Sequence, residues 1–184
     1  MSLADFEARY RADADPWGYK TSAYERTKYR ATLEACGLGP FTNALELGAS
    51  IGVFSTLVAP RCGRLTTIDA APTAVRDARR RLAGLHHVHV IEGTIPEAIP
   101  DGPYNLVIAS EILYYLTAKE LKATLVRLQG TLEGRLVAVH WRPEGPERPL
   151  TAREVHQTLR RQPWLEPRGR ADTDEYLLDV LERR

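Results

Sequence analysis

Short apolar runs alternate with amphipathic segments along most of this chain of 184 residues. Five apolar runs predict strands, and they cover residues 43–48, 64–69, 87–93, 104–109 and 135–141. The tail predicts a last strand over residues 175–181, with a weaker one near 164–170. Because helical segments separate the strands, the pattern is typical of a mostly parallel sheet with helices on both faces.

Several predicted helices begin at residues that cap helices well. Ser22, Thr117 and Thr151 each have a glutamate three residues later, which is the pattern of a capping box. We expect helices over residues 2–14, 22–36, 52–60, 72–83, 117–130 and 151–161. The segment between the third and fourth strands is short and holds prolines, so we expect a shortened helix there. The last two strands have no long helix between them, which predicts a hairpin.

The first predicted strand runs into an acidic and glycine-rich turn. Glu46, Gly48, Ser50 and Gly52 form the pattern E-x-G-x-S-x-G, and the next strand ends in Asp69. A strand, a glycine turn into a helix, and a second strand ending in an acid are typical of the nucleoside-binding half of an α/β fold. Glycine allows close approach of a ligand, and the Asp69 carboxylate would accept hydrogen bonds from ribose hydroxyls.

Three classes of protein use turns of this kind. Dinucleotide folds expect G-x-G-x-x-G, which this turn lacks. The pattern instead resembles the first motif of class I S-adenosylmethionine (SAM) methyltransferases. It also spells G-x-S-x-G, the nucleophile elbow of α/β-hydrolases, with Ser50 as nucleophile and His140 later in the chain. Only one strand precedes Ser50 and no HGGG-like loop is present, which disfavours a serine hydrolase.

Composition and charge disfavour several other classes of protein. The 43% hydrophobic content suits one globular domain over residues 1–184, and the net charge of +1 gives no bulk attraction to nucleic acid. No apolar run reaches membrane length and the start does not resemble a signal peptide, so we expect a cytoplasmic protein without a membrane partner. Two cysteines make no disulfide framework, and His87 and His89 lack further ligands, so we expect no metal.

In open α/β sheets, ligands bind beyond the carboxyl ends of the strands. Here those ends carry residues 46–52, 69–70, 92–95, 110–115 and 140–142, and we expect them to converge on one crevice. The cofactor contacts expected from them are Glu46, Gly48, Ala49, Ser50, Gly52, Asp69, Ala70, Thr94, Ile95 and Ser110.

Two residues at these strand ends are candidate catalytic groups. Glu111 follows a buried strand, and its carboxylate could orient an amine and receive its proton. His140 ends the fifth strand and is a second candidate base. Flat or polar side chains nearby are expected to contact the substrate, namely Tyr114, Tyr115, Trp141 and Arg142.

Motifs spread along the chain resemble one methyltransferase family, the nodulation protein S family. The resemblance begins with Phe6-x-x-x-Tyr10, Asp15-Pro16-Trp17 and Ser22-x-Tyr24-Glu25-x-x-Lys28-Tyr29. It continues through the glycine turn, where that family has serine at position 50, and through Leu57-x-Ala59-Pro60-Arg61-Cys62, Ser110-Glu111-x-Leu113-Tyr114-Tyr115 and Val139-His140-Trp141-Arg142.

The resemblance implies a class I methyltransferase fold of seven strands, the last antiparallel, with SAM as cofactor and S-adenosylhomocysteine (SAH) as product. It also implies N-methylation of the free amine of a deacetylated chitooligosaccharide, or of another small amine. A lid over residues 1–36 would bring Tyr10, Trp17 and Tyr24 to SAM, and residues 43–184 would form the core. Methylation of a small-molecule hydroxyl and SAM binding without catalysis remain alternatives. We expect a monomer or a weak homodimer.

Overall fold

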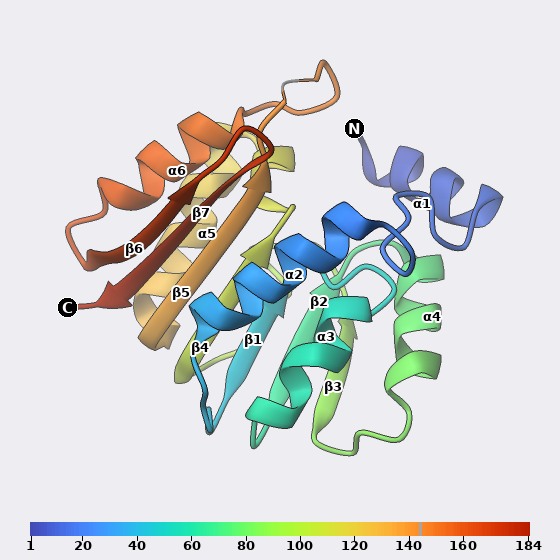
Figure 1. Cartoon of the computed structure of the whole chain (residues 1–184), viewed down its shortest axis with the longest axis horizontal. Helices are drawn as coiled ribbons and strands as arrows, with labels where there is room; N and C mark the ends of the chain where they lie inside the picture. Colours follow the sequence, from blue (N-terminus) through green and yellow to red (C-terminus); the bar gives the residue numbers. More distant parts are fainter. Residues whose placement is uncertain (144) are drawn as a thin grey trace.

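The structure, a computed structural model, describes residues 1–143 and 145–184. Its centre is a seven-stranded sheet with the order β3-β2-β1-β4-β5-β7-β6 (Figure 1). The strands are β1 (Ala44–Leu47), β2 (Leu65–Asp69), β3 (Val88–Glu92), β4 (Tyr104–Ser110), β5 (Leu132–Trp141), β6 (Leu165–Asp172) and β7 (Tyr176–Arg183). The α-helices are α1 (Leu3–Ala12), α2 (Ala23–Cys36), α3 (Val53–Val58), α4 (Pro72–Leu82), α5 (Ala118–Thr131) and α6 (Ala152–Arg160). Two short 3₁₀-helices are η1 (Ala59–Arg61) and η2 (Leu113–Tyr115).

Strand direction follows the sequence prediction. β1 to β5 pair in parallel, whereas β7 lies antiparallel between β5 and β6. The predicted seven-stranded sheet with an antiparallel last strand, and the predicted hairpin of β6 and β7, are therefore confirmed. The carboxyl ends of the five parallel strands lie along one edge of the sheet, where a ligand site is expected.

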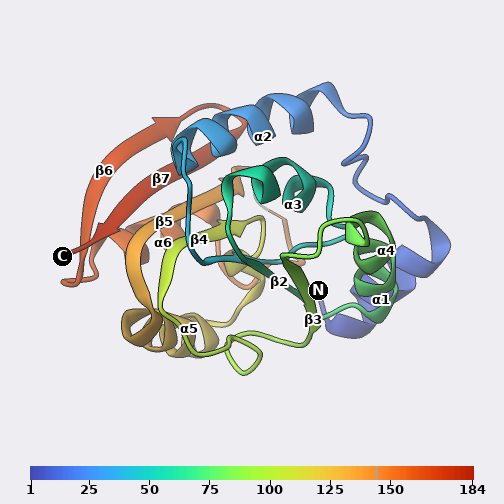
Figure 2. The same cartoon turned by 90° about the horizontal axis from the view of Figure 1, so that it is seen from below.

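Helices cover both faces of the sheet, as predicted. Alternate side chains of the central strands enter two different clusters, because successive residues of a strand point to opposite faces. Leu45 of β1 belongs to the cluster that includes Leu125 of α5. Ala44 belongs to the cluster that includes Tyr29 of α2 and Phe54 of α3. Figure 2 shows α2 and α3 on one side of the sheet and α5 on the other.

Two of the three predicted capping boxes form completely. Thr117 and Thr151 exchange side-chain and backbone hydrogen bonds with Glu120 and Glu154, respectively. Ser22 also caps its helix, since its hydroxyl accepts from the Glu25 amide at 3.3 Å. The Glu25 side chain, however, turns into the protein, so the prediction of a full capping box was wrong there.

Other differences lie at the ends of elements. The expected shortened helix between β3 and β4 is reduced to turns. β5 begins three residues earlier than predicted, because α5 runs directly into it at Leu132. Within the described ranges, no helix has the length and apolar character needed to cross a membrane.

Candidate functional site

The expected convergence of strand ends is present as a cavity at the carboxyl edge of the sheet. Residues from the N-terminal segment close it from the other side, so that α1 and the loop after it cover the strand ends. We call this space the first cavity. Its lining residues are Leu3, Phe6, Tyr10, Trp17, Tyr19, Gly48, Ser50, Ile68, Asp69, Ala70, Ala71, Gly93, Ile95, Ser110, Glu111, Ile112 and Tyr115.

The glycine turn brings the backbone close to its neighbours. Gly48 has a φ of 76°, and a Cβ there would lie 2.9 Å from the Cβ of Ile112, so any side chain would force a shift. Gly52 also has a positive φ but faces α4, where an added Cβ would lie 3.3 Å from the Cα of Ala78. Gly52 therefore serves the packing of the turn against α4, and it does not line the first cavity.

Asp69 and Ser50 both line the first cavity and are hydrogen-bonded to each other. The Ser50 amide donates to Asp69 Oδ2 at 2.7 Å, and the Ala71 amide donates to Oδ1 at 2.9 Å. Burial raises the pKa of Asp69, while these backbone amides act in the opposite direction. Each carboxylate oxygen can accept a second hydrogen bond, so Asp69 can still hold a pair of hydroxyls.

Ser50 has no base beside it. Its hydroxyl lies 2.6 Å from that of Tyr10, and its φ of 51° is unusual for a residue with a side chain. Within residues 1–143 and 145–184, no hydrogen bond joins Ser50 to a histidine. The hydrolase alternative is therefore not supported, because a nucleophilic serine needs a base to take its proton.

Glu46 lies beneath the turn. It is 2% exposed and accepts from Ser55 Oγ at 2.5 Å. Burial raises the pKa of Glu46 to about 7. Its carboxylate lies outside the first cavity, in a narrow pocket that it shares with Ala49, Ser110 and Glu25. Glu46, one of the expected cofactor contacts, is therefore not part of the lining of the first cavity.

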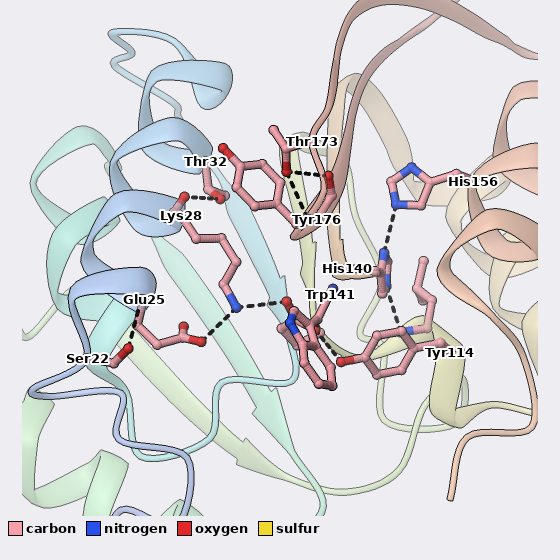
Figure 3. A network of polar contacts seen from close by, with 12 residues as sticks. Ser22, Glu25, Lys28, Thr32, Tyr114, His140, Trp141, His156, Thr173 and Tyr176 are labelled. Atoms are coloured by element: carbon pink, nitrogen blue, oxygen red, sulfur yellow. Dashed lines mark hydrogen bonds and ion pairs between the residues drawn. The ribbon is translucent and has the colours of Figure 1, made fainter. Parts of the chain in front are cut away.

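Glu111 is held by three donors. Its Oε1 accepts from Lys28 Nζ at 2.7 Å, and its Oε2 accepts from the Trp141 amide at 2.9 Å and from the Tyr114 hydroxyl. The φ of Glu111 is 55°, and a strained backbone of this kind often accompanies a functional site. Figure 3 shows Lys28 reaching from α2 toward the strand that carries Trp141.

A second cavity adjoins the first, and Trp17, Tyr19, Glu111 and Tyr115 line both. Its volume is about 250 Å³, several times that of a water molecule. We call this space the second cavity. Its lining residues are Trp17, Tyr19, Tyr24, Glu25, Lys28, Glu111, Tyr114, Tyr115, Trp141, Glu147 and Arg148. Tyr24, which the sequence analysis placed at the cofactor, lines this second cavity and not the first.

His140 does not have the geometry of a base. It is fully buried, its Nε2 accepts from the Leu113 amide at 3.2 Å, and its Nδ1 lies 3.0 Å from Nε2 of His156. His156 in turn bonds Asp179 at 2.8 Å. Burial holds the pKa of His140 well below its usual range. Since both ring nitrogens are occupied, His140 positions the η2 turn that carries Tyr114, and its predicted role as a base is not supported.

Two further predicted contacts lie elsewhere. Thr94 is exposed and outside the lining of the first cavity, where its neighbours Gly93 and Ile95 are found. Arg142 pairs with Asp172 at 2.9 Å and donates to the Thr173 carbonyl, away from both cavities.

Sequence reasoning missed Glu25 and Lys28 as site residues. Both are charged residues on a helix, and such residues are usually solvated. Lys28 is nevertheless 1% exposed and donates to Glu25 at 2.9 Å as well as to Glu111. The available signal was their spacing of three residues, which places both on one face of α2.

The chain is similar to proteins of one family. A family model described as nodulation protein S matches residues 4–137. The nodulation protein S of Sinorhizobium fredii is 35% identical over 109 residues, which are 59% of this chain and 50% of that protein. The chain thus spans about half the length of the curated relatives it matches.

Solved structures share the fold. The N-methyltransferase NodS from Bradyrhizobium japonicum, crystallised with SAH, superposes with a TM-score of 0.89 at 24% identity and covers 100% of this chain and 99% of that one. A candidate methyltransferase from Pseudomonas syringae gives a TM-score of 0.78 at 32% identity, over 88% of this chain and 100% of that one. The fold is that of the class I methyltransferases, and the chain belongs to the nodulation protein S family.

Proposed function

We propose that the protein is a SAM-dependent methyltransferase that methylates the amine of a small polar acceptor, such as an amino sugar. The observation that carries the proposal is the pair of adjoining cavities with Glu111 between them. One cavity has the chemistry of a nucleoside site, and the other has acidic and aromatic walls. Two substrates bound in the two cavities would therefore meet beside Glu111.

The first cavity fits SAM by the chemistry of its walls. Asp69 offers a carboxylate to the ribose hydroxyls, and Ile68 and Ile95 offer apolar contacts to the adenine. Glu46 and Ser110 lie toward the narrow pocket where the amino acid end would extend. When bound, SAM supplies a methyl group on a positively charged sulfur. The protein's part is to hold the acceptor nitrogen in line with that carbon and to keep water away.

The second cavity supports an amine acceptor with a ring-shaped body. Tyr114, Tyr115 and Trp141 offer flat faces of the kind that pack against sugar rings. Glu111, fixed by three donors, places a carboxyl group near the reacting nitrogen, which favours an amine over a neutral hydroxyl. The NodS structure from Bradyrhizobium japonicum bears the name of an N-methyltransferase, which agrees with this choice.

Methyl transfer from radiolabelled SAM tests the proposal. The purified protein is incubated with chitooligosaccharides that are either partly deacetylated or fully acetylated. We expect label only in the deacetylated oligomer, because only it carries a free amine. Equal labelling of both oligomers, or turnover of a hydroxyl acceptor alone, would favour O-methylation. SAM binding without labelling of any acceptor would favour a non-catalytic protein.

A further inference from the structure

Two neighbouring residues at the start of α2 carry buried polar atoms with no partner. Tyr24 Oη and Glu25 Oε2 have no hydrogen bond within the part of the chain that the structure describes. Both residues line the second cavity, and Glu25 is only 6% exposed. An unpaired buried carboxylate oxygen is costly, so Glu25 Oε2 is a position at which a donor in the adjoining cavity, from a ligand or from water, would be stabilising.

The sequence context makes the position of Glu25 unusual. Glu25 stands three residues after the cap of its helix, as Glu120 and Glu154 do in α5 and α6. Those two glutamates are exposed and return to the backbone of their caps. The Glu25 side chain does not accept from the backbone amide of its cap, and its Oε1 instead accepts a hydrogen bond from the buried Lys28. Figure 3 shows Ser22, Glu25 and Lys28 in this arrangement.

The charges around the second cavity favour a bound cation. Lys28 is shared between two carboxylates, those of Glu25 and Glu111, which leaves this group one negative charge in excess. The Arg148 guanidinium lines the same cavity but lies over the rings of Tyr114 and Trp141, at 4.8 and 5.0 Å, and among the described residues it forms no ion pair with either glutamate. A further cation would therefore be attracted to the free oxygen of Glu25.

Glu111 is less suited than Glu25 to bind a new donor. Both of its oxygens already accept hydrogen bonds, one from Lys28 and the other from Tyr114 and Trp141. Glu25, in contrast, has one oxygen fixed by Lys28 and one oxygen free. The two carboxylates thus differ, because both oxygens of Glu111 are bonded whereas one oxygen of Glu25 is buried without a partner among the described residues.

We infer that the second cavity binds the methyl acceptor through its ammonium group, with Glu25 Oε2 and Tyr24 Oη as the groups that hold it. This rests on the proposed methyltransferase function and adds a catalytic residue to it. The Glu25 carboxylate takes one proton from the ammonium, which frees the nitrogen lone pair. The lone pair bonds to the methyl carbon of SAM as the carbon–sulfur bond breaks, and that electron pair stays on sulfur. The products are a methylated ammonium and SAH, and the proton on Glu25 leaves to solvent.

The electrostatics of Glu25 agree with proton transfer. Burial raises the pKa of Glu25, the Lys28 ammonium lowers it, the Glu111 carboxylate raises it, and the nearby Tyr29 hydroxyl lowers it, with a net shift upward. A carboxylate with a raised pKa is a better proton acceptor near neutral pH than an exposed one.

Glu25→Gln tests the assignment, with Glu120→Gln as the matched control because Glu120 holds the same helix position in α5 and is exposed. Calorimetry measures the affinity for SAH, and then the affinity of the SAH complex for a glucosamine oligomer. We expect Glu25→Gln to bind SAH within about twofold of the wild type and to bind the oligomer about tenfold to a hundredfold more weakly, the range for a hydrogen bond to a charged group. The control should match the wild type in both.

A second variant and a kinetic measurement complete the test. Tyr24→Phe keeps the ring and should raise KM for the oligomer about threefold to tenfold, the range for a neutral hydrogen bond. In Glu25→Gln, kcat should fall and its pH profile should lose the limb due to the carboxylate, whereas Glu25→Asp should restore part of the rate.

Other outcomes overturn the inference in distinguishable ways. Weakened SAH binding with unchanged oligomer binding would assign Glu25 to the amino group of the cofactor. Unchanged binding of both ligands, or a lower kcat without a change of the pH profile, would make Glu25 purely structural. If the wild-type protein binds SAH and the oligomer but transfers no methyl group, the proposed function fails while the ammonium site stands.

Discussion

The hydroxyl of Tyr10 lies 2.6 Å from the hydroxyl of Ser50, so the first helix is hydrogen-bonded to the glycine turn. Trp17 packs edge-on against Tyr10 with ring centroids 5.2 Å apart, which extends this contact into the loop after α1. The N-terminal segment therefore covers the first cavity through specific contacts. A ligand held between the turn and this cover would stabilise both.

Tyr10→Phe should loosen this cover without unfolding the protein. The lost hydrogen bond should weaken SAH binding by about 0.5–1.5 kcal/mol, the range for a neutral pair. Hydrogen exchange over residues 1–20 should speed up in the variant and slow down again when SAH is added. Tyr104→Phe is the control. Tyr104 is also buried, but it is the first residue of β4 and therefore lies at the end of the strand away from the first cavity. Equal exchange with and without SAH in the wild type would show that the segment is not a ligand-dependent lid.

Asp69→Ala should weaken the binding of SAM and SAH by about 1.5–3 kcal/mol, because it removes a charged acceptor from the first cavity. Part of that loss would come from the Ser50 and Ala71 amides, which also lose their acceptor. Calorimetry measures the affinity, and Asp101→Ala is the control because the Asp101 side chain is 93% exposed. An affinity within twofold of the wild type would remove Asp69 from the site.

Glu46→Gln should change how stability depends on pH. The pKa of Glu46 is about 7 in the folded protein, above its ordinary value of 4.5. A raised folded-state pKa means that the unfolded chain releases the proton first, so this contribution to stability is present below about pH 4.5 and is lost as pH rises toward 7.

The free energy of unfolding, measured in urea at several pH values, checks this sign. Between pH 5 and pH 7, the free energy of unfolding of Glu46→Gln should fall less than that of the wild type, because glutamine does not ionise. Glu133→Gln, at an exposed position of β5, is the control. Parallel curves for wild type and Glu46→Gln would mean that Glu46 is ionised throughout this range.

The sequence was sufficient for the fold because each signal was local. Apolar runs, the Thr117 and Thr151 caps and the glycine turn all act through neighbours along the chain. The sequence also predicted that Asp69, Ser50 and Glu111 lie at one edge of the sheet, because the carboxyl ends of parallel strands meet at the same edge.

Side-chain direction was not predictable in the same way. Glu25 and Glu120 follow their caps at the same spacing, yet only Glu120 completes a capping box. The difference lies in the partner that each meets, because Glu25 faces the buried Lys28, and Lys28 also meets Glu111 from a distant part of the chain. The role of His140 was unpredictable for the same reason, since it depends on the contact with His156 in α6.

Lys28→Met should be the most destabilising of these changes. Lys28 is 1% exposed and its ammonium lies between the carboxylates of Glu25 and Glu111, at 2.9 and 2.7 Å. Methionine has a similar length but no charge, so the buried carboxylate of Glu25 and the partly buried carboxylate of Glu111 would lose the cation between them. Breaking a buried ion pair in this way costs about 3–5 kcal/mol. The free energy of unfolding in urea should fall by that amount, whereas Lys20→Met, at an exposed position, should change it little.

The double variant Lys28→Met/Glu111→Gln separates charge from packing. Removing one of the two uncompensated carboxylates should return part of the lost stability, because the like-charge repulsion disappears while the methionine remains. If the double variant is instead less stable than Lys28→Met alone, the hydrogen bonds that Glu111 accepts from Tyr114 and Trp141 outweigh the repulsion. A Lys28→Met protein with wild-type stability would contradict this prediction, since it would show that the ion pairs of Lys28 with Glu25 and Glu111 do not stabilise the fold.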